Sequence, residues 1–255
     1  MPKNSAIENS EAITSLLKDG IAIYPGDDPY TKIWEQAQAK HCKSIKFGFD
    51  QNLEVYAKSI IVEFNRIKCE IVSPSDKKKI CLNLLGSHNL RNALAAVSTA
   101  LAINIPLSNS IQVLSNFKSV SGRMECKHLN NGNLLIDDTY NANPDSVRVA
   151  IDVLSKQLHP QVFILGDMAE LGIYALDLYK EIGIYAFNSG IDCLITFGQD
   201  SKNAIPTFWN KSYICFSIQE IIDILHVLKP STILVKGSRF MRMERVIKHI
   251  LEKNI

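Results

Sequence analysis

The sequence predicts an α/β protein whose second half is a Rossmann-like unit, in which helices cover both faces of a parallel sheet. Short apolar runs alternate there with segments of helical length, which is the pattern of strands joined by helical crossovers. A composition of 46% hydrophobic and 21% charged residues over 255 residues supports two ordinary domains with their own cores. Polar residues directly follow three of the expected strands, where a parallel sheet places its ligands.

The first segment mixes expected strands with expected helices. Runs of apolar residues predict strands over about 21–24, 53–64, 67–73 and 80–85. Helical patterns follow over about 30–40, 88–103 and 108–117. The triplet "KKK" at 77–79 indicates a solvated strand end, and the small residues of "SVSGR" at 119–123 indicate a linker to the second segment.

The second segment alternates more regularly. Apolar runs predict strands at 134–137, 162–165, 193–197, 213–216 and 232–235. Helices are expected to begin at 144, 218 and 241, and a further helix to end near 188. Because successive strands are separated by helices, the sheet is expected to be parallel.

Charge and cysteine content exclude several classes of protein. The net charge of +2, from 28 basic and 26 acidic residues, leaves no basic excess for a nucleic-acid backbone. No apolar run approaches the roughly 20 residues of a membrane span, and the polar start resembles no signal peptide. The six cysteines form no CxxC pair, so neither disulfides nor zinc are expected. We therefore expect a cytoplasmic protein without nucleic-acid or membrane partners.

Three polar corners stand out because they follow expected parallel strands. The first is "DDTYNAN" (137–143), the second "GDMAELG" (166–172) and the third "KGSR" (236–239). If the strands are parallel, the three corners share one edge of one sheet and are expected to form a single cleft.

Each corner also allows a purely structural interpretation. Asn143 is suited to cap the helix that Pro144 begins, and Asp167 could cap another. Two adjacent carboxylates such as Asp137 and Asp138 repel each other unless a cation, Mg²⁺ or a ligand hydroxyl is present, which favours function. Lys236 and the nearby Arg239 suit a phosphate or carboxylate, with a surface salt bridge as the alternative.

A fourth polar cluster, "GSHNLRNALAA" (86–96), lies in the first segment. Ser87 is expected to cap a helix on which His88, Asn89 and Asn92 share the face of the first turn. Side-chain amides at a helix start can read a base edge, and the free N–H groups favour an anion. A capped helix with an ordinary histidine is the structural alternative.

Five stretches in this order, "GSHNLRNALAA", "SGRMECK", "IDDTYNANPDS", "LGDMAELG" and "LVKGSR", resemble the Mur ligase family. The resemblance covers nearly the whole chain. It implies that residues 1–121 are the C-terminal part of the central ATPase domain and that residues 122–255 are the Rossmann-like C-terminal domain. "DDTYNANPDS" and "LGDMAELG" resemble the member of the family that adds D-alanyl-D-alanine.

The resemblance implies an ATP-dependent amide-bond ligase of peptidoglycan precursor synthesis. Such an enzyme uses ATP and Mg²⁺ to convert the carboxylate of UDP-N-acetylmuramoyl-tripeptide into an acyl phosphate. The amine of D-alanyl-D-alanine then attacks this acyl phosphate, which yields an amide, ADP and phosphate. Phosphoryl transfer of this kind depends on positioning and charge neutralisation more than on covalent help from the protein.

The resemblance also implies roles for individual residues. Adenine is expected near Asn89 and Asn92 with His88 at the edge, the phosphates near Arg123, and the ribose near Asp138. The complete ATP-binding set is His88, Asn89, Asn92, Arg123, Asp138, Tyr140 and Asn141. The catalytic set is Arg123, Asp138, Asn143 and Lys236. The acceptor carboxylate is expected at Lys236, Ser238 and Arg239.

The chain also departs from the family pattern. None of its 12 glycines is followed by Lys, so it contains no P-loop; in the family pattern this motif, the Mg²⁺-binding Glu and the UDP-sugar domain precede residue 1. Asn9 replaces a usual carbamylated Lys, Pro25 a usual Asn and Tyr179 a usual His. We therefore expect a truncated or split ligase, inactive alone, with an incomplete Mg²⁺ site and a separate N-terminal portion as partner.

Two other functions remain open at this point. The fold could serve as a non-catalytic module that binds a nucleotide or a partner protein. A nicotinamide oxidoreductase is disfavoured because no G-x-G-x-x-G follows any expected strand.

Overall fold

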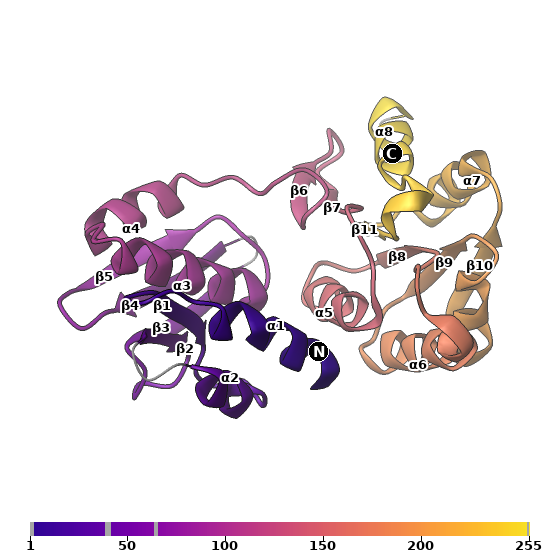
Figure 1. Ribbon diagram of the computed structural model, residues 1–255. Helices are drawn as coiled ribbons and strands as arrows, with labels where there is room; N and C mark the ends of the chain where they lie inside the picture. The colour runs from indigo at the N-terminus through magenta and orange to yellow at the C-terminus, as the bar shows by residue number, and fades with distance from the viewer. Residues whose placement is uncertain (1–2, 39–41, 64–65, 254) are drawn as a thin grey trace. The chain divides into compact units, whose positions relative to one another are not determined.

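A computed structural model describes residues 3–38, 42–63, 66–253 and 255 of the chain. The chain divides into two compact units, residues 1–118 and residues 119–255, which are described separately below (Figure 1). None of the helices in the described ranges is long and apolar enough to cross a membrane.

Unit 1 is built on a five-stranded sheet with the order β1-β2-β3-β4-β5. The strands are β1 (Ile21–Pro25), β2 (Lys43–Gly48), β3 (Val55–Glu63), β4 (Arg66–Val72) and β5 (Lys77–Leu82). The first three run parallel, and β4 is antiparallel to both of its neighbours. As a result, β1, β2, β3 and β5 point the same way, and their carboxyl ends share one edge of the sheet.

Helices cover unit 1 on both sides of β1. The helices are α1 (Lys3–Thr14), α2 (Thr31–Ala37), α3 (Ser87–Ala102) and α4 (Leu107–Ser115). α3 packs on β1, β2 and β3, and its buried Leu90 and Leu94 belong to the main core of the unit. α1 and α2 form a smaller core with the opposite side of β1, where the Trp34 indole donates a hydrogen bond to Ala6 O at 3.1 Å.

Unit 2 contains a six-stranded sheet with the order β10-β9-β8-β11-β7-β6. The strands are β6 (Glu125–His128), β7 (Leu134–Asp138), β8 (Gln161–Gly166), β9 (Cys193–Phe197), β10 (Lys211–Cys215) and β11 (Thr232–Lys236). All are parallel except the edge strand β6, which is antiparallel to β7. Every residue of β7, β8 and β11 is buried, as expected for strands covered on both faces.

The helices of unit 2 cover both faces of this sheet (Figure 1). α5 (Pro144–Leu154) packs against α6 (Ala175–Asn188) on one face, and α7 (Ile218–Leu228) packs against α8 (Glu244–Lys253) on the other. Three short 3₁₀ helices complete the unit: η1 (Gly172–Tyr174), η2 (Ser201–Thr207) and η3 (Arg239–Met241). The α/β class and the Rossmann-like second unit predicted from the sequence are therefore confirmed.

Besides the short 3₁₀ helices, one α-helix and two strands were not predicted, and each has weak hydrophobic periodicity. α1 buries only Ala6 and Ile13, and β2 carries two lysines in six residues. β6 is a four-residue edge strand, "ECKH", without a buried residue. The last helix was also predicted too early, because η3 occupies the residues before α8 begins at Glu244.

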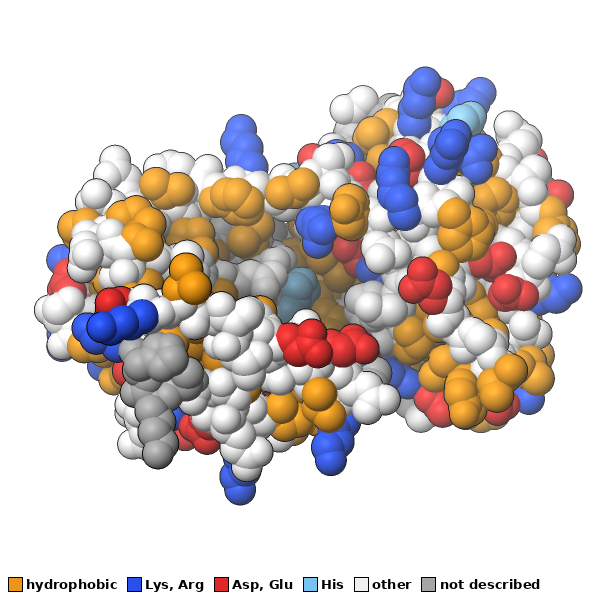
Figure 2. All heavy atoms as spheres, viewed as in Figure 1, with side chains coloured by type: hydrophobic (Ala, Val, Ile, Leu, Met, Phe, Trp, Pro, Cys, Tyr) orange, Lys and Arg blue, Asp and Glu red, His pale blue; other side chains and the backbone are white. Residues whose placement is uncertain are grey.

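Positive side chains gather on the C-terminal segment of unit 2. Residues 239–253 contain five Lys or Arg and two Glu, a net charge of +3 in a chain whose total is +2. Lys and Arg side chains are visible at the surface over α8, at the upper right of Figure 2. This segment begins with Arg239, the last residue of the "KGSR" corner, so positive charge continues from that corner into α8.

Gly183 of α6 is expected to be essential for the packing of unit 2. A Cβ atom at this position would lie 2.1 Å from Ala204 O and 2.3 Å from the Thr207 hydroxyl, both part of η2. We predict that Gly183→Ala lowers the free energy of unfolding by about 1–3 kcal/mol, the usual cost of overpacking. Urea denaturation followed by circular dichroism measures this, and Ile184→Ala on the exposed side of the same helix is the control. Equal stability of the Gly183→Ala and parent chains would contradict the close α6–η2 contact.

Candidate active site at the carboxyl edge of the second sheet

The three polar corners of unit 2 lie side by side. β11 pairs in parallel with β8 on one side and with β7 on the other, and Lys236 at its end is opposite both Leu165 and Asp138. The expectation of three corners on one sheet edge is therefore confirmed. The register places the last residue of β11 beside the second carboxylate of "DDTYNAN".

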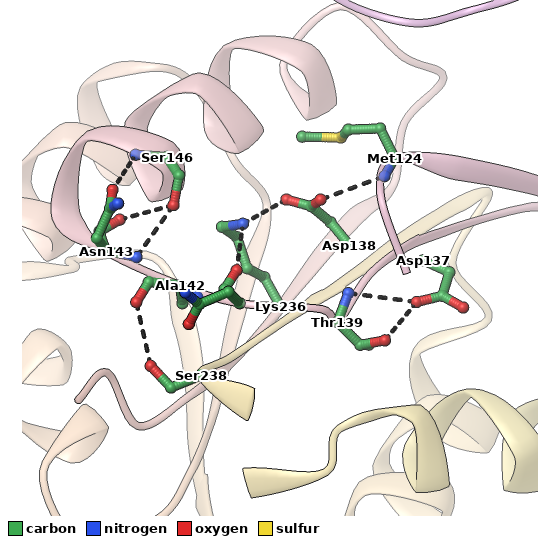
Figure 3. A network of polar contacts seen from close by, with 10 residues as sticks. Met124, Asp137, Asp138, Thr139, Ala142, Asn143, Ser146, Lys236 and Ser238 are labelled. Atoms are coloured by element: carbon green, nitrogen blue, oxygen red, sulfur yellow. Dashed lines mark hydrogen bonds and ion pairs between the residues drawn. The ribbon is translucent and has the colours of Figure 1, made fainter. Parts of the chain in front are cut away.

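Lys236 and Asp138 form a buried ion pair between the two strands (Figure 3). Lys236 Nζ lies 2.5 Å from Asp138 Oδ2 and also donates to Asn141 O at 2.9 Å. The other oxygen of Asp138 accepts a hydrogen bond from Met124 N at 3.2 Å. The side chains are only 3% and 12% exposed. Burial raises the pKa of Asp138, while Lys236 and the Met124 N–H act in the opposite direction.

The second carboxylate of the pair has its own partners. Asp137 Oδ1 accepts a hydrogen bond from the Thr139 hydroxyl at 2.6 Å and from Thr139 N at 3.3 Å. Figure 3 shows that the two carboxylates point away from each other. The cation that the adjacent carboxylates require is thus Lys236 of the same chain, and the pair does not depend on a ligand to relieve repulsion.

Ser238 joins the three corners. Its hydroxyl donates to Ala142 O at 3.1 Å in the first corner and accepts from Ala169 N at 2.8 Å in the second. Its own N–H donates to Asp167 O at 3.0 Å. We call Ser238 and these three partners the Ser238 junction.

Asn143 caps α5, as the sequence predicted. Its side chain accepts from Ser146 N at 2.8 Å, and the Ser146 hydroxyl accepts from Asn143 N at 3.0 Å, which completes a capping box (Figure 3). Pro144 occupies the first helical position. The side-chain oxygen of Asn143 is therefore used at the start of α5, where the first corner ends.

Asp167 holds a fourth corner that the sequence analysis overlooked. Its carboxylate accepts hydrogen bonds from the backbone N–H groups of Gln199, Asp200 and Ser201, which follow β9 and lead into η2. The capping interpretation of Asp167 is correct, although the capped helix is η2 rather than the helix next in sequence. The stretch "GQDS" (198–201) after the strand at 193–197 is the signal that could have revealed this corner, since a glycine and polar residues again directly follow a buried strand.

Arg123 and Tyr140 form an exposed pair at the start of unit 2. The guanidinium carbon lies 4.1 Å from the centre of the Tyr140 ring, a cation–π contact, and the Tyr140 residue is 48% exposed. Tyr140 N donates to Gly122 O at 2.9 Å. Gly122 has φ = +75°, and a Cβ atom there would lie 3.1 Å from Tyr140 N, so only glycine fits without strain.

Arg239 also lies at the surface, with its side chain 64% exposed. Its guanidinium lies 3.3 Å from Glu244 at the start of α8. Glu244 is only half-buried as a residue, but its Oε2 atom, which faces Arg239, is hidden from solvent. Among the residues of "KGSR", Lys236 and Ser238 are buried in internal bonds, and Arg239 alone presents a charge to solvent.

The fourth predicted cluster lies in unit 1, at the start of α3. The prediction that Ser87 caps this helix is wrong: the helix begins at Ser87, and Gly86 is the N-cap residue without a side-chain hydrogen bond. Asn89 Nδ2 donates to Leu85 O at 2.7 Å, and Asn92 Nδ2 lies 3.5 Å from Asn89 Oδ1. His88 precedes them in the same first turn. The structure therefore brings the two amides together on one face, as their spacing predicted.

A second polar group in unit 1 was overlooked by the sequence analysis. Asp27 follows β1, and its carboxylate accepts from Phe49 N at 2.7 Å and from Arg91 Nη1 at 2.5 Å. The Arg91 guanidinium carbon lies 4.8 Å from the centre of the Phe49 ring. These contacts tie the ends of β1 and β2 to the start of α3. Arg91 lies within "GSHNLRNALAA", so its charge was the available signal.

The positions that depart from the family pattern are also placed by the structure. Asn9 lies on α1, and Pro25 ends β1. Tyr179 is buried on α6, where its hydroxyl oxygen accepts a hydrogen bond from Met168 N at 2.5 Å, and burial raises its pKa. In the described ranges, no group of three or more His, Cys, Asp or Glu side chains is arranged to hold a metal ion.

The buried ion pair generates a prediction about stability. Lys236→Met leaves Asp138 buried without its cation, and Asp138→Asn leaves Lys236 buried with only neutral partners. Each change is expected to lower the free energy of unfolding by about 3–5 kcal/mol, the usual cost of breaking a buried pair. The double variant should lose less than the sum of the two, because neither charge is then stranded. Urea denaturation of the four chains measures the coupling, and strictly additive losses would show that the two side chains do not interact.

Comparison with known proteins gives the relationships of both units. The sequence profile of the Mur ligase middle domain matches residues 5–100, and that of the Mur ligase glutamate ligase domain matches residues 122–239. The UDP-N-acetylmuramoyl-tripeptide--D-alanyl-D-alanine ligase of Buchnera aphidicola subsp. Baizongia pistaciae is 34% identical over 247 residues, which are 95% of this chain and 53% of the relative.

Solved structures show the same relationship. MurF from Acinetobacter baumannii matches with a TM-score of 0.85 and 29% identity over 95% of this chain and 54% of that protein. MurF from Thermotoga maritima in complex with ADP matches with a TM-score of 0.79 and 23% identity over 96% of this chain and 57% of that protein, which shows the shared fold. The chain spans about half the length of these relatives. The two units match consecutive domains of one family, and the second match includes the three polar corners. The chain therefore belongs to the Mur ligase family.

Proposed function

We propose that this chain supplies the acceptor domain and part of the ATP site of a ligase that adds D-alanyl-D-alanine to UDP-N-acetylmuramoyl-tripeptide. The observation that carries the proposal is the shared sheet edge, where the three corners of β7, β8 and β11 meet. The proposal is also supported by the sequence similarity to a UDP-N-acetylmuramoyl-tripeptide--D-alanyl-D-alanine ligase, which extends over 95% of the chain. Such a reaction uses UDP-linked precursors, so we place the protein in the cytoplasm.

The reaction requires two chemical tasks at this edge. The negative charge of the ATP phosphates must be neutralised during transfer to the tripeptide carboxylate, and the acceptor dipeptide must be held by its own carboxylate. The second unit offers an exposed cation for each task, Arg123 beside Tyr140 of the first corner and Arg239 at the end of the third. The net charge of +3 in residues 239–253 adds long-range attraction for anionic substrates.

We assign Arg123 to the ATP phosphates. The ring of Tyr140 supports one face of its guanidinium and leaves its N–H groups free to donate to phosphate oxygens. The Asp138 carboxylate, 12% exposed, is assigned to the ribose, with Asn141 beside it and Asn143 at the start of α5 nearer the reacting carboxylate. Lys236 then acts mainly by keeping Asp138 ionised and in place.

We assign Arg239 to the carboxylate of the acceptor dipeptide. The guanidinium is the exposed side of its pair with Glu244, so an arriving carboxylate can reach it from solvent while Glu244 stays in place. Lys236 and Ser238, which the resemblance also implied for this role, support the corner from inside.

In unit 1 we assign Asn89, Asn92 and His88 to adenine. The two amides share one face of the first two turns of α3, and together they carry donors and acceptors that a base edge can pair with. The side chains of unit 1 therefore suit an adenine base. Mg²⁺ does not fit the described residues, because they provide no cluster of carboxylates to hold it. The proposed mechanism therefore assigns no role to the metal on this chain. We assign residues 1–121 to the C-terminal part of the central domain and residues 122–255 to the C-terminal domain.

The proposed function predicts reconstitution of ligase activity. The 255-residue chain is mixed with a separately made N-terminal portion of a relative that carries a P-loop and a UDP-sugar domain. Phosphate release from ATP is expected only when UDP-N-acetylmuramoyl-tripeptide and D-alanyl-D-alanine are both present, because the acyl phosphate is formed on the first and consumed by the second.

Each chain alone, and the mixture without D-alanyl-D-alanine, are the controls for this measurement. A stable complex that releases no phosphate would favour the alternative, a non-catalytic binding module. Turnover by the 255-residue chain alone would show that residues 1–255 suffice, contrary to the expectation from the absent P-loop.

The assignment of Arg239 predicts a change in affinity for one substrate. Arg239→Gln removes the charge for the acceptor carboxylate, so the KM for D-alanyl-D-alanine is expected to rise by about 10–100-fold, the usual effect of one charge-assisted pair. The KM for ATP should stay within a factor of about two, because Arg239 is assigned to the acceptor and not to ATP. Lys248→Gln, which removes an equal charge from the exposed face of α8, is the matched control. An equal rise in both variants would assign the effect to net charge instead of Arg239.

A further inference from the structure

The Ser238 hydroxyl has little capacity left for a ligand. A serine hydroxyl has one donor, and that donor is used by Ala142 O. Its oxygen already accepts from Ala169 N, and the residue is 1% exposed. Direct contact with the acceptor carboxylate would require this hydrogen to leave Ala142 O and the site to open.

The backbone around the Ser238 junction has little room to adjust. A Cβ atom at Gly237 would lie 2.7 Å from Met243 Cγ and 3.2 Å from the Gly166 Cα. A Cβ atom at Gly166 would lie 2.8 Å from Met243 Sδ. The ends of β8 and β11 are therefore packed against each other and against Met243, so a change at Ser238 is transmitted to the backbone instead of being absorbed.

Ser238 and two of its partners each directly precede a notable residue at this sheet edge. Ala142 precedes Asn143, the N-cap of α5. Ala169 precedes Glu170, whose φ of +61° is rare for a residue other than glycine. Ser238 itself precedes Arg239. One side chain thus fixes the backbone positions from which three neighbouring segments leave the sheet.

We propose that Ser238 is a positioning residue that keeps these three segments in register for ligation, and that it does not bind the acceptor. The inference rests on the proposed function, since it assigns a role within that site. A positioning residue acts on the geometry of the reacting groups, so its loss lowers kcat. A binding residue would instead raise the KM for D-alanyl-D-alanine.

The first test uses the 255-residue chain alone and needs no activity. In Ser238→Ala, the amide N–H of Ala169 loses its acceptor, and its hydrogen exchange is expected to accelerate about tenfold or more, the effect of removing one buried hydrogen bond. The amide of Met168, which bonds to Tyr179, is the internal reference and should keep its rate.

Ser201→Ala is the matched control for this test. Ser201 is also fully buried at the same sheet edge, and its hydroxyl has no hydrogen-bond partner among the described residues. Its removal should leave the exchange of Ala169 unchanged. Ser238→Thr keeps a hydroxyl and should restore slow exchange at Ala169. Unchanged exchange at Ala169 in Ser238→Ala would overturn the proposal whatever the enzyme does.

The second test uses the reconstituted ligase. Ser238→Ala is expected to lower kcat by about tenfold or more with the KM for D-alanyl-D-alanine within a factor of about two, because the groups are misplaced while the acceptor still binds. A loss confined to that KM, with normal kcat, would overturn the positioning role in favour of direct binding. If the parent mixture shows no D-alanyl-D-alanine-dependent turnover, the proposed function fails, and the exchange of Ala169 still decides whether Ser238 positions the corners.

Discussion

The buried ion pair between Lys236 and Asp138 is the interaction on which the rest of the site depends. It joins the last residues of two neighbouring parallel strands, and Asp138 also holds Met124 at the start of unit 2. A buried pair of charges adds little net stability compared with apolar residues, but stranding either charge is costly. The pair therefore disfavours any β7–β11 register in which the two strand ends do not lie side by side. The corners that follow these strands are placed next to each other for the same reason.

The polar residues of the sheet edge divide into two groups by burial. Asp137, Asp138, Lys236 and Ser238 use their polar atoms mostly for one another and for backbone groups of the corners. Arg123 and Arg239 lie at the surface, where Arg123 contacts the Tyr140 ring and Arg239 contacts the half-buried Glu244. Such a division suits a ligase of charged substrates. Rigid internal bonds keep the corners in place, while the exposed cations can exchange their partners for a phosphate or a carboxylate.

Unit 1 follows the same design at the carboxyl edge of its own sheet. Asp27 after β1 receives hydrogen bonds from Phe49 after β2 and from Arg91 on α3, which fixes the start of the helix that carries Asn89 and Asn92. In both units a carboxylate at a strand end organises backbone groups and a cation from a neighbouring element. Residues proposed to meet ATP are thus held in place by ion pairs and hydrogen bonds with neighbouring elements.

The sequence by itself determined the fold class, the five parallel strands of the second unit, the Asn143 cap and the meeting of three corners. These follow from local periodicity, from helix-capping chemistry and from the rule that parallel strands end at one edge. Short elements with few buried residues, such as α1, β2 and β6, lacked that local signal. Only the tertiary structure decided which polar residues are internal. Asp138 finds its cation 98 positions away in Lys236, and Asp167 caps a helix more than 30 positions away. Pairings over such distances depend on strand order and register, which arise when the whole sheet packs and leave no trace in the spacing of neighbouring residues.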